Sequence, residues 1–314
     1  MRAKGEKKVK AIRLPVSGGP EALVYEEALQ PLPGAGEVLV QVHATAVTPT
    51  EFSWYPTSHT ATGEARPLPI ILGHEFSGVV AAIGPEVTDL SQGTEVYGLN
   101  NWFSDGAEAE YCIARSIEVA PKPRSIDHVQ AAVVPISALT AWQGLFDHGN
   151  LHAGQRVLIH GAAGGVGSFA VQLARWRGVQ VIGTASTHNV DFLHELGANQ
   201  IIDYKLTRFE EIVKDVDAVF DTVGGETLQR SWSVVKPGGK VVTIAADSEA
   251  ATDPAIKEAF FIVEPNREQL IEIARLIDAG HIRPFVDTVF PLAQARNAYQ
   301  HKPTRGKAVL QVIK

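Results

Sequence analysis

A glycine-rich loop between an apolar strand and an amphipathic helix restricts the fold of this 314-residue chain more than any other feature. The strand covers residues 157–160, the loop runs from Gly161 to Gly167, and helical spacing continues to residue 177. Glycines let backbone N–H groups approach a pyrophosphate closely, and the N-terminus of a helix favours its negative charge. The loop therefore predicts a dinucleotide site; the alternative is a glycine turn that binds nothing.

Strands and helices alternate after this loop. The further predicted strands are 180–185, 200–203, 217–221 and 240–245. The predicted helices between them are 190–196, 209–213 and 227–235. Alternation of this kind is typical of a parallel, doubly wound sheet with helices on both faces. We expect this Rossmann unit to occupy residues 126–264.

The two ends of the chain do not show this alternation of strands and helices. Residues 1–125 contain short runs rich in Val, Ile and aromatic residues, separated by Gly and Pro, as in β-rich domains. After residue 264 the pattern is mixed, with a helix expected at 267–279 and short strands at 260–263 and 308–313. The predicted fold class is α/β, with a β-rich domain assembled from residues 1–125 and 265–314 around the Rossmann domain.

The composition argues against several classes of protein. A formal net charge of −7 disfavours a nucleic-acid partner. The single cysteine, Cys112, excludes an intramolecular disulfide and any site that needs two thiolates from one chain. Two uncharged stretches, Val129–Phe146 and Val157–Ala174, contain glycine, proline or polar side chains and fit a buried core better than a membrane span.

The N-terminal segment also bears on location. Residues Met1–Lys10 are basic and polar and lack the apolar core of a signal peptide. We therefore expect a cytoplasmic protein with neither a membrane nor a nucleic acid as partner. Two acidic residues further along, Glu108 and Glu110, are expected to be solvated.

The choice between NAD and NADP depends on the segment after the predicted strand 180–185. An NAD site places an Asp or Glu there to bind the ribose hydroxyls, but this chain has Ser186, Thr187 and His188. Hydroxyls and an imidazole suit a 2′-phosphate better than a carboxylate does. Tyr204 and Lys205 follow the next strand and add a phenol and a cation at the same edge. This pattern favours NADP, although Ser186 and Thr187 could equally cap the next helix.

The glycine loop with its flanks, His160–Arg175, resembles the zinc-independent quinone oxidoreductase branch of the medium-chain dehydrogenase/reductase superfamily. The other motifs that carry the resemblance are, in order, 18–23, 33–40, Gly73-His74-Glu75-x-x-Gly78, 138–141, 236–239 and 306–310. It implies a GroES-like domain from both chain ends, a Rossmann domain between them, and an active site in the cleft. It also implies hydride transfer from NADPH to a quinone or to the C=C bond of an α,β-unsaturated carbonyl, without metal.

The resemblance assigns site residues, although it assigns no catalytic acid or base because the cofactor carries the difficult step. The implied cofactor residues are Thr140, Ala163, Gly164, Gly165, Val166, Gly167, Ser186, His188, Tyr204, Ala245, Phe261, Ile262 and Val263. The implied substrate-cleft residues are Thr48, Glu51 and Phe52; Trp54, next to them in the sequence, is expected either to cover a planar substrate or to be a core or interface aromatic. In this segment the family often has Asn-Pro-x-Asp, whereas this chain has Thr48 and Glu51 in place of Asn and Asp, which leaves the substrate open.

Other functions remain open at this point. Zinc alcohol dehydrogenases share the motif around His74, but a catalytic zinc needs three protein ligands, and no cysteine or acid stands at the matching positions, Thr48 and Ile136. We therefore expect no metal. A third possibility is a protein that binds NADPH without turnover, as a sensor or partner. The resemblance also implies a homodimer that pairs through the edge of the Rossmann sheet, near residues 240–245.

Overall fold

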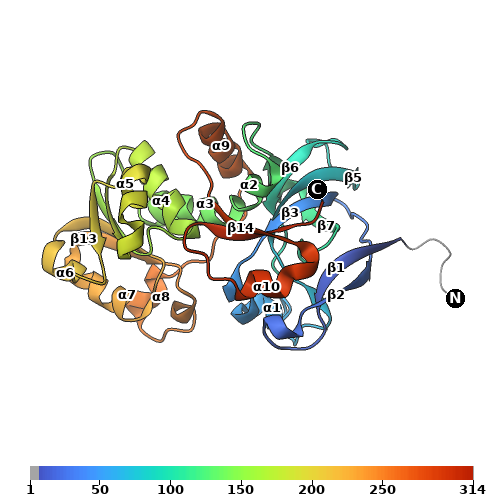
Figure 1. Cartoon of the computed structure of the whole chain (residues 1–314), viewed down its shortest axis with the longest axis horizontal. Helices are drawn as coiled ribbons and strands as arrows, with labels where there is room; N and C mark the ends of the chain where they lie inside the picture. Colours follow the sequence, from blue (N-terminus) through green and yellow to red (C-terminus); the bar gives the residue numbers. More distant parts are fainter. Residues whose placement is uncertain (1–6, 314) are drawn as a thin grey trace.

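The computed structural model describes residues 7–313, so the first six residues of the N-terminal segment discussed above lie outside it. It has two lobes side by side, each built around its own sheet (Figure 1). One lobe contains a five-stranded parallel sheet in the order β11-β10-β9-β12-β13. Its strands are β9 (Arg156–Ile159), β10 (Gln180–Ala185), β11 (Gln200–Asp203), β12 (Val216–Asp221) and β13 (Val235–Thr243).

This sheet is buried on both faces, as the alternation of strands and helices predicts. Along the central strand β9, Val157 and Ile159 belong to one apolar cluster and Leu158 to another. The helices of this lobe are α4 (Gly165–Trp176), α5 (Val190–Leu196), α6 (Phe209–Ile212), α7 (Gly225–Ser231) and α8 (Pro254–Ala259). Helix α4 carries a buried apolar face because its small and apolar residues recur at helical spacing.

The second lobe is β-rich and contains both ends of the chain. Its larger sheet has the order β14-β15-β3-β5-β6-β8, with β7 paired to β3, and its smaller sheet has the order β2-β1-β4. Strand β15 runs antiparallel to β3, with Val309 opposite Ala46. The strands are β1 (Lys8–Leu14), β2 (Val24–Leu29), β3 (Glu37–Ala46), β4 (Ile70–Ile71), β5 (Glu75–Ile83), β6 (Glu95–Leu99), β7 (Tyr111–Arg115), β8 (Val119–Pro121), β14 (Val286–Pro291) and β15 (Lys307–Gln311).

The predicted fold class is thus confirmed, whereas the two domain boundaries, at 125/126 and 264/265, stay a prediction. The remaining helices are α1 (Tyr55–Ser58), α2 (His128–Ala132), α3 (Pro135–Trp142), α9 (Arg267–Asp278) and α10 (Ala295–Gln300). The lobes share apolar packing: Tyr97 of β6, Leu139 of α3 and Leu270 of α9 lie in one cluster. The Tyr97 hydroxyl donates to the Leu270 carbonyl at 2.5 Å, which ties β6 to α9.

The two uncharged stretches form several short elements rather than one helix each. Residues 129–146 are divided among α2, α3 and a π-helical turn, and residues 157–174 are divided among β9, the glycine loop and α4. Within residues 7–313, no helix combines the length and the apolar character needed to cross a membrane.

The strand expected at 260–263 does not form. Phe260 makes only an isolated bridge to Thr243. Beyond it, a side chain takes the place of a neighbouring strand: the Gln143 amide accepts from the Glu264 N–H at 3.0 Å and donates to its carbonyl at 2.8 Å. These bonds hold the segment in an extended conformation outside any sheet.

Candidate cofactor site and substrate cleft

The glycine loop lies between the end of β9 and the start of α4, and its glycines have different roles. Gly161 has a φ of +67°, a left-handed conformation that favours glycine. A Cβ on Gly167 would collide with the carbonyl oxygen of Gly161 and lie 2.7 Å from the Cα of Ala162. Gly164 has an ordinary φ of −73°, and a Cβ there would meet only the Gly161 oxygen, at 3.3 Å. The space beside Gly164 is open, next to the first-turn N–H groups of α4, which have no intrahelical partners.

The segment after β10 lies beside the segment after β11. Ser186 is buried, and its hydroxyl lies 3.3 Å from the imidazole of His188. The Tyr204 N–H donates to the Ala185 carbonyl at 3.1 Å, and the Tyr204 side chain is 59% exposed. The structure therefore brings the three predicted 2′-phosphate residues, Ser186, His188 and Tyr204, to one edge of the sheet.

The predicted nicotinamide residues differ in how exposed they are: most are buried, and one has an exposed side chain. Thr140 is buried on α3, and Ala245 is buried just after β13. The Phe261 ring stacks on His148 with 4.3 Å between ring centroids, and both Phe261 and Val263 belong to the main apolar cluster. Ile262, at 57% exposure, is the residue of this trio with a free side chain. Phe261 and Val263 thus position the segment, while Ile262 and the backbone remain available to a ligand.

An ion pair of the β-rich lobe, between Lys307 and Glu75, also contacts α3 and the glycine loop. The Lys307 ammonium contacts the Glu75 carboxylate and donates to the Thr48 hydroxyl at 2.7 Å. The other Glu75 oxygen accepts from the backbone N–H of Ile136 at 2.9 Å, in the first turn of α3. Glu75 is fully buried, and burial raises its pKa while Lys307 opposes that rise. A Cβ on Gly165 would lie 2.9 Å from the Lys307 Cγ, so the lysine stem packs directly on the glycine loop.

Lys307 also gives Thr48 a defined chemical character. An ammonium is only a donor, so the Thr48 oxygen accepts from it and keeps its own proton for another acceptor. A hydroxyl that accepts a charge-assisted hydrogen bond is a polarised donor. Neither Glu75 nor Lys307 was among the residues that sequence reasoning assigned to the site. The only sequence signals were their positions in the Gly-His-Glu and Gly306–Leu310 motifs.

Both ring nitrogens of His74 are occupied by protein groups. Nδ1 lies 2.6 Å from Glu51 Oε1, which also accepts from the Gly73 N–H at 2.8 Å. Nε2 lies 3.2 Å from the Ser104 carbonyl. A histidine that binds zinc through one nitrogen commonly donates its other N–H to a carboxylate, so Glu51 leaves only Nε2 for a metal, and Nε2 faces the Ser104 carbonyl. Thr48, at a position where zinc enzymes carry a ligand, instead bonds Lys307.

The residues present therefore do not fit a catalytic zinc. Across residues 7–313, no group of three or more His, Cys, Asp and Glu side chains is arranged to hold a metal ion. The Cys112 thiol is buried in a β-rich cluster, where burial raises its pKa.

Two aromatic pairs show how the predicted cleft residues are arranged. Trp54 packs edge-to-face against Trp102 with 5.4 Å between ring centroids, and the Trp102 ring lies 5.5 Å from that of His74. Phe52 packs against Tyr299 at 4.9 Å in the core of the β-rich lobe. Trp54 thus lies on the His74 side, whereas Phe52 helps to hold the segment in place.

The prediction that Glu108 is solvated was wrong. Its side chain is fully buried and accepts from the Tyr299 hydroxyl at 2.7 Å. Glu110, two residues later, is partly exposed and accepts from the Lys10 N–H at 2.8 Å. Burial, reinforced by the charge of Glu51, raises the pKa of Glu108 to about 8.

This carboxyl makes stability depend on pH. Because the pKa of Glu108 is higher in the folded protein than its ordinary value of 4.5, the folded state holds the proton more tightly. The contribution of Glu108 to the free energy of unfolding is therefore fully present below pH ~4.5. It falls by up to about 1.4 kcal/mol per pH unit above that, and the decline levels off above pH ~8. We expect Glu108→Gln to flatten this decline, as measured by urea unfolding at pH 5, 7 and 8.5. Glu110→Gln is the matched control, and an equal pH dependence in all three proteins would contradict the assignment.

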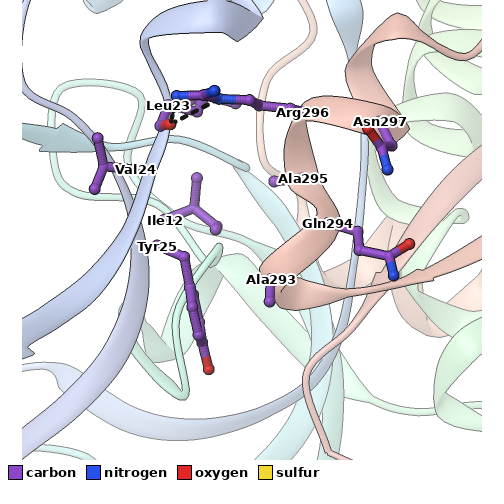
Figure 2. A pocket seen from close by; sticks show the side chains of 9 residues that line it. All are labelled: Ile12, Leu23, Val24, Tyr25, Ala293, Gln294, Ala295, Arg296 and Asn297. Atoms are coloured by element: carbon purple, nitrogen blue, oxygen red, sulfur yellow. Dashed lines mark hydrogen bonds between the residues drawn. The ribbon is translucent and has the colours of Figure 1, made fainter.

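Two surface cavities lie apart from the predicted cofactor and cleft residues. One, of about 350 Å³, lies between the β1–β2 hairpin and the segment that leads into α10; the Arg296 guanidinium beside it donates to the Leu23 carbonyl at 2.9 and 3.1 Å (Figure 2). Another, of about 620 Å³, borders β1, β2 and β7. Neither is lined by a predicted cofactor or cleft residue, so neither coincides with the predicted active site.

Comparison with known proteins agrees with this geometry. Residues 34–124 match the alcohol dehydrogenase GroES-like domain, and residues 196–310 match a family described as zinc-binding dehydrogenase. The 2-methylene-furan-3-one reductase of Solanum lycopersicum is 33% identical over 88% of this chain and 71% of its own. The chloroplastic NADPH-dependent alkenal/one oxidoreductase of Arabidopsis thaliana is 33% identical over 88% of this chain and 72% of its own. The structure of the quinone oxidoreductase from Coxiella burnetii has a TM-score of 0.88 and 31% identity, covering 98% of this chain and 100% of that chain.

The fold, the site and these relatives together define an oxidoreductase that uses a nicotinamide cofactor. The chain belongs to the medium-chain dehydrogenase/reductase superfamily, in its zinc-independent quinone and enone reductase branch. The family to which the resemblance pointed is thereby confirmed.

Proposed function

We propose that the protein is an NADPH-dependent, metal-independent reductase of quinones or of the C=C bond of α,β-unsaturated carbonyls. The observation that carries the proposal is the donor set around His74: Thr48 bonds Lys307, and within residues 7–313 no group of three metal-ligating side chains includes this imidazole. The Lys307-bound Thr48 hydroxyl is then a polar donor in the cleft. The relatives include enone and alkenal reductases as well as a quinone oxidoreductase, so both classes of acceptor are represented among them.

In this proposal the residues bind, orient and exclude water. When bound, the nicotinamide supplies a hydride, and the site needs only to place the acceptor against it. The Thr48 hydroxyl donates to the substrate carbonyl oxygen, where negative charge develops during reduction. Trp54 and Trp102 cover a planar acceptor, and the proton that completes the reduction comes from solvent or a hydroxyl.

The remaining assignments are part of the same proposal. The preference for NADPH is supported by the absence of a carboxylate among residues 186–189, directly after β10. We propose a cytoplasmic homodimer in which the outer edges of two β13 strands pair, since β13 ends the parallel sheet. Size-exclusion chromatography with light scattering tests the dimer, and a monomer at micromolar concentration would refute it.

The first test is oxidation of NADPH and NADH with a small enone and with a naphthoquinone, before and after EDTA. We expect turnover with NADPH that survives the chelator, and the better acceptor then separates the two substrate classes. Activity only on an alcohol, lost in EDTA, would mean a zinc alcohol dehydrogenase. Tight NADPH binding without turnover on any acceptor would favour a non-catalytic sensor or partner.

A further inference from the structure

An arginine from the C-terminal segment reaches the other lobe at the predicted 2′-phosphate site. Arg305 precedes β15 in the segment that passes between the lobes (Figure 1). Its Nε donates to Asn189 Oδ1 at 3.0 Å, and its Nη2 donates to the His188 carbonyl at 3.2 Å. Its guanidinium also lies over the Phe192 ring, 4.7 Å from the centroid.

We propose that Arg305 binds the 2′-phosphate of NADP(H) and determines the preference for NADPH. This inference rests on the proposed function, in which the glycine loop binds a dinucleotide. Ser186, His188 and Tyr204 offer hydroxyls and an imidazole but no permanent positive charge. A phosphate needs such a charge. Lys205 supplies one at this edge, and arginine adds a second in a fork that matches phosphate oxygens.

Arg305 is positioned for this role before any ligand arrives. Two of its nitrogens are already bonded to residues 188 and 189, and Nη1 has no hydrogen-bond partner within the part of the chain that the structure describes. The ring beneath it is itself fixed, because Phe192 packs edge-to-face against Phe285 at 4.8 Å. A side chain held in this way loses little rotamer freedom on binding, so more of its interaction energy appears as affinity.

The charges around Arg305 make its contribution necessary. Asp203 ends β11 opposite Ala185, and its pKa is lowered chiefly by a hydrogen bond from Thr187, with help from the Lys205 N–H and nearby positive charge. An ionised carboxylate at this edge repels a phosphate and would suit a ribose hydroxyl. The cation of Arg305 offsets that repulsion, together with Lys205.

The structure supplies a matched control on the same aromatic pair. The Arg283 guanidinium lies 5.1 Å from the Phe285 centroid, and its Nη2 is 3.6 Å from Glu195. Glu195 lies near the end of α5, whereas Asn189 precedes its start; at 1.5 Å per residue, the two arginines contact points about 9 Å apart along the helix. Arg283→Gln therefore removes an equal charge from a similar setting, but away from the predicted phosphate.

The test compares dissociation constants of NADPH and NADH, by titration of their fluorescence, in wild type, Arg305→Gln, Arg305→Lys and Arg283→Gln. We expect wild type to prefer NADPH. Arg305→Gln should weaken NADPH by ~10–100-fold, the effect of losing hydrogen bonds to a charged group, and should leave NADH nearly unchanged. Arg305→Lys should lose less, and Arg283→Gln should retain the wild-type ratio. The salt dependence of NADPH binding should also become weaker in Arg305→Gln.

Each other outcome overturns the inference in a recognisable way. Equal weakening of both dinucleotides in Arg305→Gln would mean that the arginine only holds the two lobes together. An unchanged ratio in that variant would mean that other groups bind the phosphate. A wild type that binds both cofactors equally would refute the role of Arg305 while the reductase function stands. A wild type that binds neither would refute both proposals.

Discussion

Replacing Lys307 by methionine is expected to lower the free energy of unfolding by about 3–5 kcal/mol, because it leaves the buried Glu75 carboxylate without its cation. For a chain of this size the thermal midpoint should fall by on the order of 10 °C. The loss should grow as pH rises, since burial alone raises the pKa of Glu75 and ionisation then becomes more costly. Urea unfolding and calorimetry at pH 5 and 8 measure both effects.

The control separates the loss of a buried partner from the loss of a lysine. Lys307→Met combined with Glu75→Gln removes both charges and should recover a large part of the stability, as in a double-mutant cycle. Lys8 forms a comparable pair with Glu27 on the surface, with the two side chains 63% and 48% exposed, so Lys8→Met should leave the midpoint unchanged. If Lys307→Met were as stable as wild type, the buried Glu75 carboxylate would not depend on this cation for its stability.

The architecture is predictable from sequence where local signals determine it. The strand, glycine loop and helix at 156–176 are adjacent in sequence, and the strand and helix each have their own periodicity, so this unit follows directly from the sequence, while dinucleotide binding at it stays a prediction. The prediction of a strand at 260–263 was wrong because the residues there alternate between buried and exposed, as they do in a strand, although beyond the isolated bridge at Phe260 they pair with no neighbouring strand. The backbone partner of this segment is the Gln143 side chain, 121 residues away from Glu264.

The charged groups of the site were not predictable for the same reason. Glu75 and Lys307 are 232 residues apart, Arg305 and His188 are 117 apart, and Glu108 and Tyr299 are 191 apart. An isolated Glu or Arg in a loop has the sequence signature of a solvated side chain. Only the fold shows that the C-terminal segment passes the glycine loop. There Lys307 pairs with Glu75 and Arg305 bonds the His188 carbonyl, although both residues look solvated in the sequence.

Two glycines of the loop should respond in opposite ways to alanine. Gly164→Ala is expected to weaken NADPH binding by ~10–100-fold while changing stability by at most about 1 kcal/mol, the cost of a poorer helix cap. The protein can accommodate this methyl group with a shift of a few tenths of an ångström, since the only close atom is the Gly161 oxygen at 3.3 Å and φ is −73°. We therefore attribute the requirement for glycine at residue 164 to the proposed approach of the pyrophosphate to the backbone.

Gly167→Ala is the contrasting variant, because its Cβ would meet the backbone of Gly161 and Ala162 in the absence of any ligand. We expect it to lower the free energy of unfolding by about 1–3 kcal/mol or more, since backbone cannot move aside as a side chain can. Thermal unfolding and NADPH titration of both variants separate the two causes. A stable Gly164→Ala protein that binds NADPH as tightly as wild type would show that the phosphates do not lie against residue 164, and the loop would then be a turn required only for folding.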